Sequence, residues 1–125
     1  MLAGDAASRA LGIEVTDVGM GFATATMTVR ADMVNGHNIT HGGFVFAVAD
    51  TAFACACNSH GPLTVAAAAD ITFVAPTYAG DVLVARAIER TRFGRTGIYD
   101  VTVSRGEDVI AEFRGTSRTI ERPST

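Results

Sequence analysis

A single charged side chain, Asp50, interrupts a long apolar run that extends from Gly42 to Asn58. No other Asp, Glu, Arg or Lys lies between His41 and His60. A helix built from this run has almost no polar face, and such helices are buried inside a domain. The run therefore predicts a central helix that the rest of the chain must cover.

The carboxylate of Asp50 allows two interpretations. An isolated carboxylate in apolar surroundings costs several kcal/mol unless it is paired, hydrogen-bonded or neutralised. Perturbed carboxylates in apolar clefts are common catalytic groups, so we favour a functional role. In the alternative, Asp50 meets water at the helix surface or accepts hydrogen bonds from a neighbouring loop.

Composition narrows the class of protein. The 125 residues suffice for one domain with a real core, and they carry a formal net charge of −3 without a basic run. This charge pattern argues against a nucleic-acid-binding protein. Apolar residues make up 48% of the chain, and the mean hydropathy is +0.27. Such a composition predicts a further buried surface, for example a subunit interface.

The cellular compartment is predicted from what the sequence lacks. The segment from Met1 to Ala10 has no apolar core of signal-peptide length. The run from Gly42 to Cys57 is too short to span a membrane, which takes about 20 residues. Cys55 and Cys57 would point to different sides of a helix and cannot pair with each other. We expect a cytoplasmic protein with free thiols, no metal site and no membrane or nucleic-acid partner.

The segments around the central helix have strand-like patterns. Ala23, Ala25 and Met27 alternate with Thr residues, which is typical of a half-buried strand. In the last segment Val109, Ala111 and Phe113 alternate with Glu112, Arg114 and Arg118. The expected elements are a short helix Ala6 to Leu11, strands Ile13 to Val18 and Ala23 to Arg30, a polar loop Ala31 to Thr40, a helix from about Gly43 to Asn58, and strands Leu63 to Ala75, Asp81 to Phe93, Thr96 to Arg105 and Asp108 to Ile120.

The order of these elements predicts the fold class. The helix and the strands are not interleaved, which argues against a parallel doubly wound sheet. The order predicts one α+β domain over residues 1–125, in which an antiparallel sheet covers the long helix. One sheet covers only part of a helix that is apolar nearly all round. A second copy of the chain is the simplest cover for the remainder.

The runs Asn35–Gly43 (NGHNITHGG) and Ala49–Ala54 (ADTAFA) resemble the hotdog-fold acyl-CoA thioesterases. The resemblance is strongest to the phenylacetate-degradation branch, which acts on phenylacetyl-CoA, hydroxyphenylacetyl-CoA and similar thioesters. It extends over most of the chain and includes residues 10–13, 97–101 and 113–115. It implies an antiparallel sheet wrapped around one long central helix, in dimers that usually pair into tetramers. It also implies hydrolysis without a cofactor, because coenzyme A is part of the substrate.

The same resemblance implies roles for individual residues. The family's catalytic carboxylate corresponds to Asp50, and its oxyanion donor, a backbone N–H, corresponds to Gly42. The active-site Asn and His of the family correspond to Asn35 and His41. Some members carry a Ser or Thr near the nucleophilic water, in the strand after the helix, whereas this chain has Ala at all four positions 66–69. Thr51 is a candidate replacement for that hydroxyl.

Elementary chemistry supports a pairing of Asp50 with the glycines. Asp50 is suited to act as a general base or as a nucleophile that forms a mixed anhydride. Gly42 and Gly43 stand at a helix N-terminus, where free N–H groups favour an anion. Gly43 and Asp50 lie about two turns, or ~10 Å, apart along the helix axis. One carbonyl cannot contact both in one chain, so we expect composite sites in which Gly42 of one subunit faces Asp50 of the other.

Other residues are candidates for substrate binding. Arg92 and Arg95, beside Gly94 and Thr96, suit the phosphates of coenzyme A, although a solvated turn is the alternative. Phe44, Phe53 and Met33 are expected to line an apolar acyl pocket. Structural roles stay open for several of the residues above: Asn35 as a turn residue, His41 as a helix-flanking residue, and His60 as a partner of the helix C-terminal dipole.

Two further functions compete with hydrolysis. A hydratase or dehydratase of the same fold would pair His41 with Asp50, but the pattern from Asn35 to Phe53 favours hydrolysis. A non-catalytic acyl-CoA-binding protein would need an effector or DNA-binding segment, for which the chain has no room.

Overall fold

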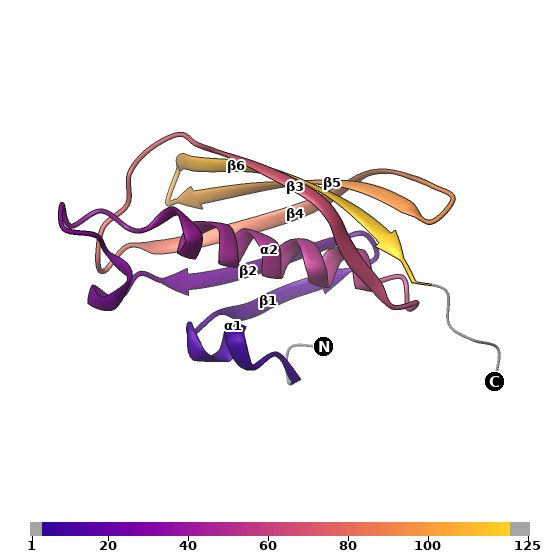
Figure 1. The fold of residues 1–125 in the computed structure, drawn as a ribbon, viewed down its shortest axis with the longest axis horizontal. Coiled ribbons are helices and arrows are strands. Elements are labelled where there is room, and N and C mark those ends of the chain that lie inside the picture. Colours follow the sequence, from indigo (N-terminus) through magenta and orange to yellow (C-terminus); the bar gives the residue numbers. More distant parts are fainter. Residues whose placement is uncertain (1–3, 121–125) are drawn as a thin grey trace.

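One long helix lies within the curve of a six-stranded antiparallel sheet (Figure 1). The computed structural model describes residues 4–120, so the first three residues of the N-terminal segment considered above lie outside it. The elements are α1 (Ala6–Ala10), β1 (Glu14–Gly19), β2 (Phe22–Thr28), the 3-10 helix η2 (Ala31–Met33), α2 (Gly42–Asn58), β3 (Thr64–Phe73), β4 (Val82–Phe93), β5 (Thr96–Arg105) and β6 (Asp108–Thr119).

The sheet has the strand order β1-β2-β4-β5-β6-β3, and all neighbouring strands are antiparallel. An additional residue in one strand of a pair bends that strand and increases its twist. Such irregularities help the sheet to curve around the helix. They lie between Val15 and Asp17 in β1, between Ala66 and Ala68 in β3, between Glu89 and Thr91 in β4, and between Val109 and Ala111 in β6.

Helix α2 forms the centre of the core. Its buried residues are Val45, Val48, Ala49, Thr51, Ala52, Phe53, Cys55, Ala56 and Cys57. The ring of Phe53 lies 5.6 Å from the ring of Tyr99 on β5 and 5.7 Å from that of Phe113 on β6, measured between centroids. The expected antiparallel sheet around a buried central helix is therefore confirmed.

Asn58 joins the end of α2 to the beginning of β3. Its side-chain amide donates to the carbonyl oxygens of Ala54 and Thr64, at 2.9 and 3.0 Å, and its amide oxygen accepts from the N–H of Thr64 at 3.0 Å. In Figure 1, β3 runs diagonally past this end of α2. The three hydrogen bonds fix the spacing between the helix and the edge strand, and a groove lies in that space.

The expected element boundaries agree with the structure to within a few residues, but two details differ. The loop expected from Ala31 to Thr40 begins with the 3-10 helix η2. The alternation of Val109 with Ala111 and Phe113 does not place these three side chains on one face of the strand. The pairing of β5 with β6 shifts register at this point, so that Ile110 becomes the buried residue and Val109 is 41% exposed.

Strand β3 has a free edge, because it is the last strand of the sheet and pairs only with β6. Nearly all of its residues are exposed, including Val65 and Phe73. Unpaired edges with apolar side chains readily accept another strand. This edge is therefore the part of the sheet best suited to pair with a second chain.

Candidate active site

Asp50 lies in a groove of about 550 Å³ between α2 and β3. The helix residues that line this groove recur at intervals of three and four, so they form one face of α2. They are Asp50, Phe53, Ala54, Cys57 and Asn58. The opposite wall consists of the loop after the helix and the first residues of β3, from Gly61 to Ala66. Apart from Asp50 and the polar residues Asn58 and Thr64, the side chains that line the groove are apolar.

The carboxylate of Asp50 is only half-buried, although the surrounding helix is apolar. Burial raises its pKa, and the negative charge of Asp5 raises it further. Within residues 4–120, no hydrogen bond or ion pair reaches this carboxylate. The interpretation in which a loop donates hydrogen bonds to Asp50 is therefore not supported. An ionisable group without a partner, facing a groove, is what a general base or nucleophile requires.

Thr51, the neighbour of Asp50, faces a different direction. Its Oγ1 atom lies 2.8 Å from the Oγ atom of Ser8 on α1. Both side chains are buried. The role of Thr51 as a substitute hydroxyl near the nucleophilic water stays a prediction, and its hydroxyl already has a partner in α1.

Gly42 lies at the other end of α2, in a separate groove of about 370 Å³. This second groove is bounded by residues 73–77 and by Ile39 and Thr40. A Cβ atom on Gly42 would come within 2.7 Å of the Phe73 ring, whereas a Cβ atom on Gly43 would meet nothing within 4 Å. Space for a ligand atom therefore exists beside Gly43, whereas the Phe73 ring lies close to Gly42. The N-cap residue is His41, and its side chain makes no capping hydrogen bond.

Asn35 shapes the loop before α2. Its side-chain oxygen accepts hydrogen bonds from the N–H groups of His37, at 2.9 Å, and Ile39, at 3.1 Å. These bonds agree with the turn role considered from the sequence. The side-chain NH₂ group of Asn35 provides two further donors. Phe44 is half-buried on the first turn of the helix and packs against the core.

The expected phosphate-binding residues gather in one small hollow at the C-terminal end of α2. Arg92, Gly94, Arg95 and Thr96 all line it, and so does His60. The hollow shares two lining residues, at positions 57 and 64, with the groove that contains Asp50. The hollow and the groove are therefore neighbours.

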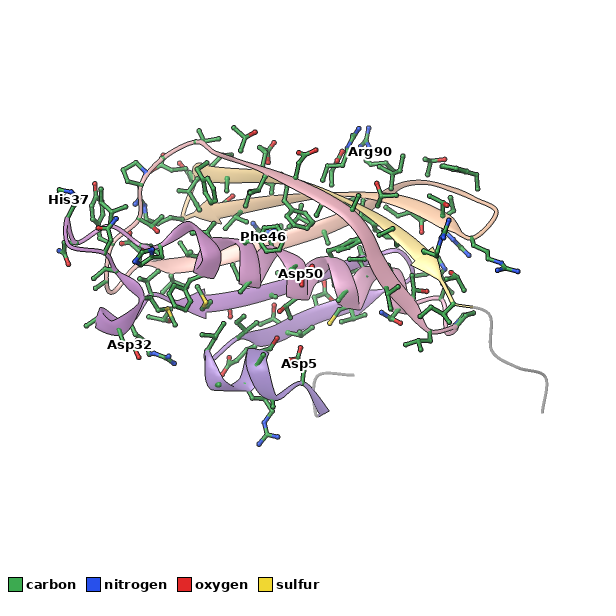
Figure 2. The ribbon with its side chains drawn as sticks, viewed as in Figure 1. Asp5, Asp32, His37, Phe46, Asp50 and Arg90 are labelled. Atoms are coloured by element: carbon green, nitrogen blue, oxygen red, sulfur yellow. The ribbon has the colours of Figure 1, made fainter. Side chains whose placement is uncertain are left out.

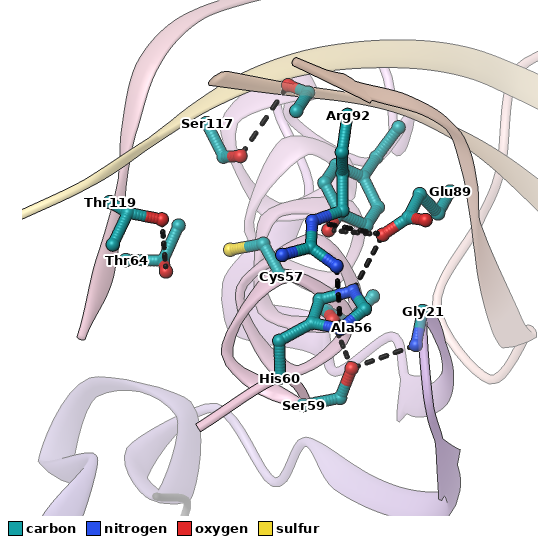
Figure 3. Close-up of polar contacts among 12 residues, drawn as sticks. Gly21, Ala56, Cys57, Ser59, His60, Thr64, Glu89, Arg92, Ser117 and Thr119 are labelled. Carbon is teal, nitrogen blue, oxygen red and sulfur yellow. Dashed lines mark hydrogen bonds and ion pairs between the residues drawn. The ribbon is translucent and has the colours of Figure 1, made fainter. Parts of the chain in front are cut away.

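His60 belongs to a polar network that the sequence did not indicate (Figure 3). Its Nε2 atom lies 2.6 Å from Oε1 of Glu89, and its Nδ1 atom lies 3.0 Å from Nη1 of Arg92. Arginine can only donate, so Nδ1 accepts and Nε2–H donates to Glu89. The hydroxyl of Tyr99 donates to the same Glu89 oxygen at 2.9 Å. His60 is thus bound to strand β4 and does not simply face the helix dipole.

The structure separates the expected site residues into two groups within one chain. Gly42, Gly43 and His41 lie at the beginning of α2, whereas Asp50 lies eight residues after Gly42, about 12 Å along the helix axis. The contacts of Asp5 and Ser8 with this region were missed, because they depend on how α1 packs. A lone Asp three residues before a Ser indicates only a helix N-cap.

Two absences apply to the described part of the chain. Within residues 4–120, no helix has both the length and the apolar content needed to cross a lipid bilayer. In the same range, no group of three or more His, Cys, Asp and Glu side chains is arranged to hold a metal ion.

The comparisons with known proteins agree on the family. The model of the thioesterase superfamily matches residues 37–112. The chain is 48% identical to the Escherichia coli acyl-coenzyme A thioesterase PaaI over 121 residues, which cover 96% of this chain and 86% of that protein. The structure of the E. coli PaaI protein from the phenylacetic acid degradation operon superposes with a TM-score of 0.94, covering 97% of this chain and 88% of that one at 47% identity.

A second solved structure is similar. It is a mutant of the phenylacetic acid degradation protein PaaI from Thermus thermophilus, with a TM-score of 0.87 and 38% identity over 90% of this chain and 97% of that one. The antiparallel sheet wrapped around one helix defines a hotdog-fold protein, and the unpaired carboxylate in its groove is compatible with hydrolysis. The chain belongs to the thioesterase superfamily, as expected from its sequence.

Proposed function

We propose that this protein hydrolyses aryl-acetyl-CoA thioesters, of the phenylacetyl-CoA or hydroxyphenylacetyl-CoA type, to the free acid and coenzyme A. The main support is its high similarity to an acyl-CoA thioesterase over almost the whole chain. A solved relative comes from a phenylacetic acid degradation operon, so we assign the protein to the catabolism of aromatic acids. No cofactor takes part, since coenzyme A arrives with the substrate.

In this proposal Asp50 is the reacting carboxylate, and the N–H of Gly42 stabilises the oxygen that becomes negative. As a general base, Asp50 accepts a proton from water while the water oxygen attacks the carbonyl carbon. The tetrahedral intermediate then collapses, the C–S bond breaks, and the proton moves to the departing thiolate. Losing one oxyanion donor typically costs roughly 3 kcal/mol of transition-state stabilisation.

The alternative for Asp50 is direct attack, which forms a mixed anhydride and releases the CoA thiol before water cleaves the anhydride. A single turnover in ¹⁸O-labelled water can identify direct attack. Direct attack followed by cleavage at the enzyme carbonyl leaves one ¹⁸O atom in the carboxylate of Asp50. Catalysis by a general base places the label only in the product acid, and so does cleavage of the anhydride at the acyl carbonyl. Label in Asp50 is therefore the diagnostic result.

The groove arrangement supports a dimer with composite sites. Residues Val65 and Ala66, at one end of β3, face the groove of Asp50. Phe73, at the other end, faces the groove of Gly42. If the free edge of β3 pairs antiparallel with its own copy about an axis near Ala69, the Phe73 end of each strand lies beside the Ala66 end of the other. This pairing brings the Gly42 groove of one subunit to the Asp50 groove of its partner.

The remaining site residues receive roles by position. Asn35, through its NH₂ group, and His41 would contact the thioester or the water from the same side as Gly42. Gly43 leaves space for the thioester, and Phe44 contributes apolar surface for the acyl group. Arg92 and Arg95, with Gly94 and Thr96, would bind a phosphate group of coenzyme A, because guanidinium groups donate paired hydrogen bonds to phosphate.

A pairing of two such dimers into a tetramer belongs to the same proposal. The outer face of the sheet exposes apolar side chains on β2 and β4, among them Phe22, Val82 and Ile88. A second dimer would cover this surface. Light scattering on the purified protein should give the mass of four chains, and the mass of two chains would contradict the pairing.

A location in the cytoplasm is also proposed. Cys55 and Cys57 are buried and are both in the thiol form, and burial raises the pKa of the Cys57 thiol to about 11. Two buried cysteines that keep their thiols are typical of proteins that stay in a reducing compartment.

The test is the release of free thiol from phenylacetyl-CoA by the wild type and by Asp50→Asn, which keeps the shape of the side chain and removes its charge. We expect a loss of about 10²–10⁴-fold in kcat. Equal release by both proteins would remove Asp50 from its role. Tight binding of phenylacetyl-CoA without release would favour a binding protein, and turnover of an enoyl-CoA in its place would favour a hydratase.

A further inference from the structure

The short helix α1 is attached to α2 by a chain of hydroxyl groups next to Asp50. Ser8 is the one buried residue of α1. Its Oγ–H donates to Oδ2 of Asp5 at 2.7 Å, and its backbone N–H donates to Oδ1 of Asp5 at 3.0 Å. On its other side, the Oγ atom of Ser8 lies 2.8 Å from Oγ1 of Thr51.

The number of available protons determines which group donates in each of these hydrogen bonds. A serine hydroxyl has one proton, and an ionised carboxylate can only accept. Hydrogen bonds from the side chain and then from the backbone of Ser8 lower the pKa of Asp5, so Asp5 stays ionised. The proton of Ser8 therefore points to Asp5, and Thr51 must donate to Ser8. The hydroxyl proton of Thr51 is used in holding α1.

Asp50 immediately precedes Thr51, so the turn of α2 that is bound to α1 is the turn that carries the reacting carboxylate. Figure 2 shows Asp5 and Asp50 on these two neighbouring elements. After burial, the charge of Asp5 is the other influence that raises the pKa of Asp50. The sequence could not indicate this proximity, because 45 positions separate the two residues.

On the basis of the function proposed above, we propose that Asp5 is a positioning residue for Asp50. Through Ser8 and Thr51 it holds α1 against the turn of α2 that carries Asp50, and it places a fixed negative charge beside the carboxylate that activates water. Asp5 itself needs no contact with the substrate.

The other groups around Asp50 do not offset this charge. Cys57, on the same face of α2, is a neutral thiol, because burial raises its pKa to about 11. Asn58 and Thr64 are polar but uncharged. From the loop and β3, the groove is lined by Gly61, Leu63, Val65 and Ala66, none of which ionises. Within the described residues, Asp5 is thus the charged side chain that influences Asp50, and a carboxylate with raised pKa is a stronger base.

The decisive variant is Asp5→Asn. Asparagine is as good an N-cap residue as aspartate, so α1 keeps its cap while the charge is lost. Asp17→Asn is the matched control, because it removes an exposed carboxylate from β1. Asp5→Ser is a second neutral cap in case Asp5→Asn unfolds. The readouts are the pH dependence of kcat/KM and the titration of the Asp50 carboxyl carbon by ¹³C NMR, with Asp50→Asn used to assign its signal.

We expect the acidic limb of the pH profile and the NMR titration of Asp50 to move to lower pH in Asp5→Asn, with kcat on the plateau changed by less than about tenfold. Asp17→Asn should keep both midpoints. Unchanged midpoints in Asp5→Asn would overturn the inference, and so would a lower plateau with unchanged midpoints, since α1 would then act only as a packing element. Full activity of Asp50→Asn would instead contradict the proposed function, and the NMR titration would still test the coupling of Asp5 to Asp50.

Discussion

The backbone of Gly115 on β6 lies close to the outer end of the Phe53 ring on α2. A Cβ atom at position 115 would come within 2.8 Å of three ring carbons of Phe53. The ring is 1% exposed and is held between Tyr99 and Phe113. The sheet can approach the central helix this closely because residue 115 has no side chain.

Gly115→Ala should therefore destabilise the protein. Overpacking in a well-filled core typically costs about 1–3 kcal/mol, and we expect a loss of this size in the free energy of unfolding measured with urea. Phe53→Leu in the same chain should recover part of the loss, because the smaller side chain frees the space. Gly36→Ala is the control, since a Cβ atom there meets nothing within 4 Å. Equal stability of Gly115→Ala and the wild type would contradict the packing argument.

The sequence predicted the fold well because its main signals are local. The apolar run of α2 and the alternation in β2 each depend on residues close together in the chain. The exposure of Val109 does not follow from the sequence, because alternation does not reveal an extra residue such as Ile110. Two sets of hydrogen bonds were not predictable, because they depend on the packing of distant elements. One set links Asp5, Ser8 and Thr51, and the other links His60 with Glu89.

The same limit applies to the candidate site. Asp50 could be found from the sequence because a single charge in an apolar run conflicts with burial. The separation of Gly42 from Asp50 also followed, from the rise of a helix. That the Arg92 hollow adjoins the groove of Asp50 could not be predicted, since this depends on where β4 and β5 turn relative to the end of α2.

Glu89→Gln should destabilise the protein at neutral pH. Burial raises the pKa of Glu89, but hydrogen bonds from His60 and Tyr99 outweigh it and lower the pKa below its usual value. A lowered pKa adds stability above the unfolded-state pKa, and that stability is lost as the pH falls through the folded-state pKa. The difference between wild type and Glu89→Gln in urea unfolding should therefore shrink towards acidic pH. If the difference in stability does not depend on pH, the effect of the substitution comes from lost packing and not from the charge of Glu89.

Asp50→Asn should have the opposite effect on stability. The pKa of Asp50 is raised in the folded state by burial and by Asp5. A raised carboxyl pKa favours the folded state below the unfolded-state pKa, and this contribution is lost as the pH rises through the folded-state pKa. At pH 7 the variant should therefore unfold at higher urea concentration than the wild type while hydrolysis is lost. Near pH 3 the two proteins should unfold at nearly the same urea concentration. If the variant were less stable than the wild type at pH 7, this would contradict the conclusion that the carboxylate has no partner.

The composite site can be tested by mixing two inactive variants. Gly42→Pro removes the backbone N–H, and proline is well tolerated at the first position of a helix. The exposed ring of Phe73 must move aside to admit the proline Cβ atom. His41 already has an extended ψ of 134°, which suits a residue before proline. In a mixed dimer of Gly42→Pro and Asp50→Asn, one site combines both defects and the other has neither. With random pairing half of the dimers are mixed, so about a quarter of the wild-type activity per chain should return.

The matched control mixes Gly42→Pro with a chain that carries both substitutions, where no pairing contains an intact site. Mass spectrometry of differently tagged chains should first verify that subunits exchange. Recovery in the first mixture and none in the control supports a thioester held between Asp50 of one subunit and Gly42 of its partner. If exchange is complete and neither mixture is active, each site lies within one chain. In that case the two grooves at opposite ends of α2 cannot serve one carbonyl group, because the helix keeps them about 12 Å apart.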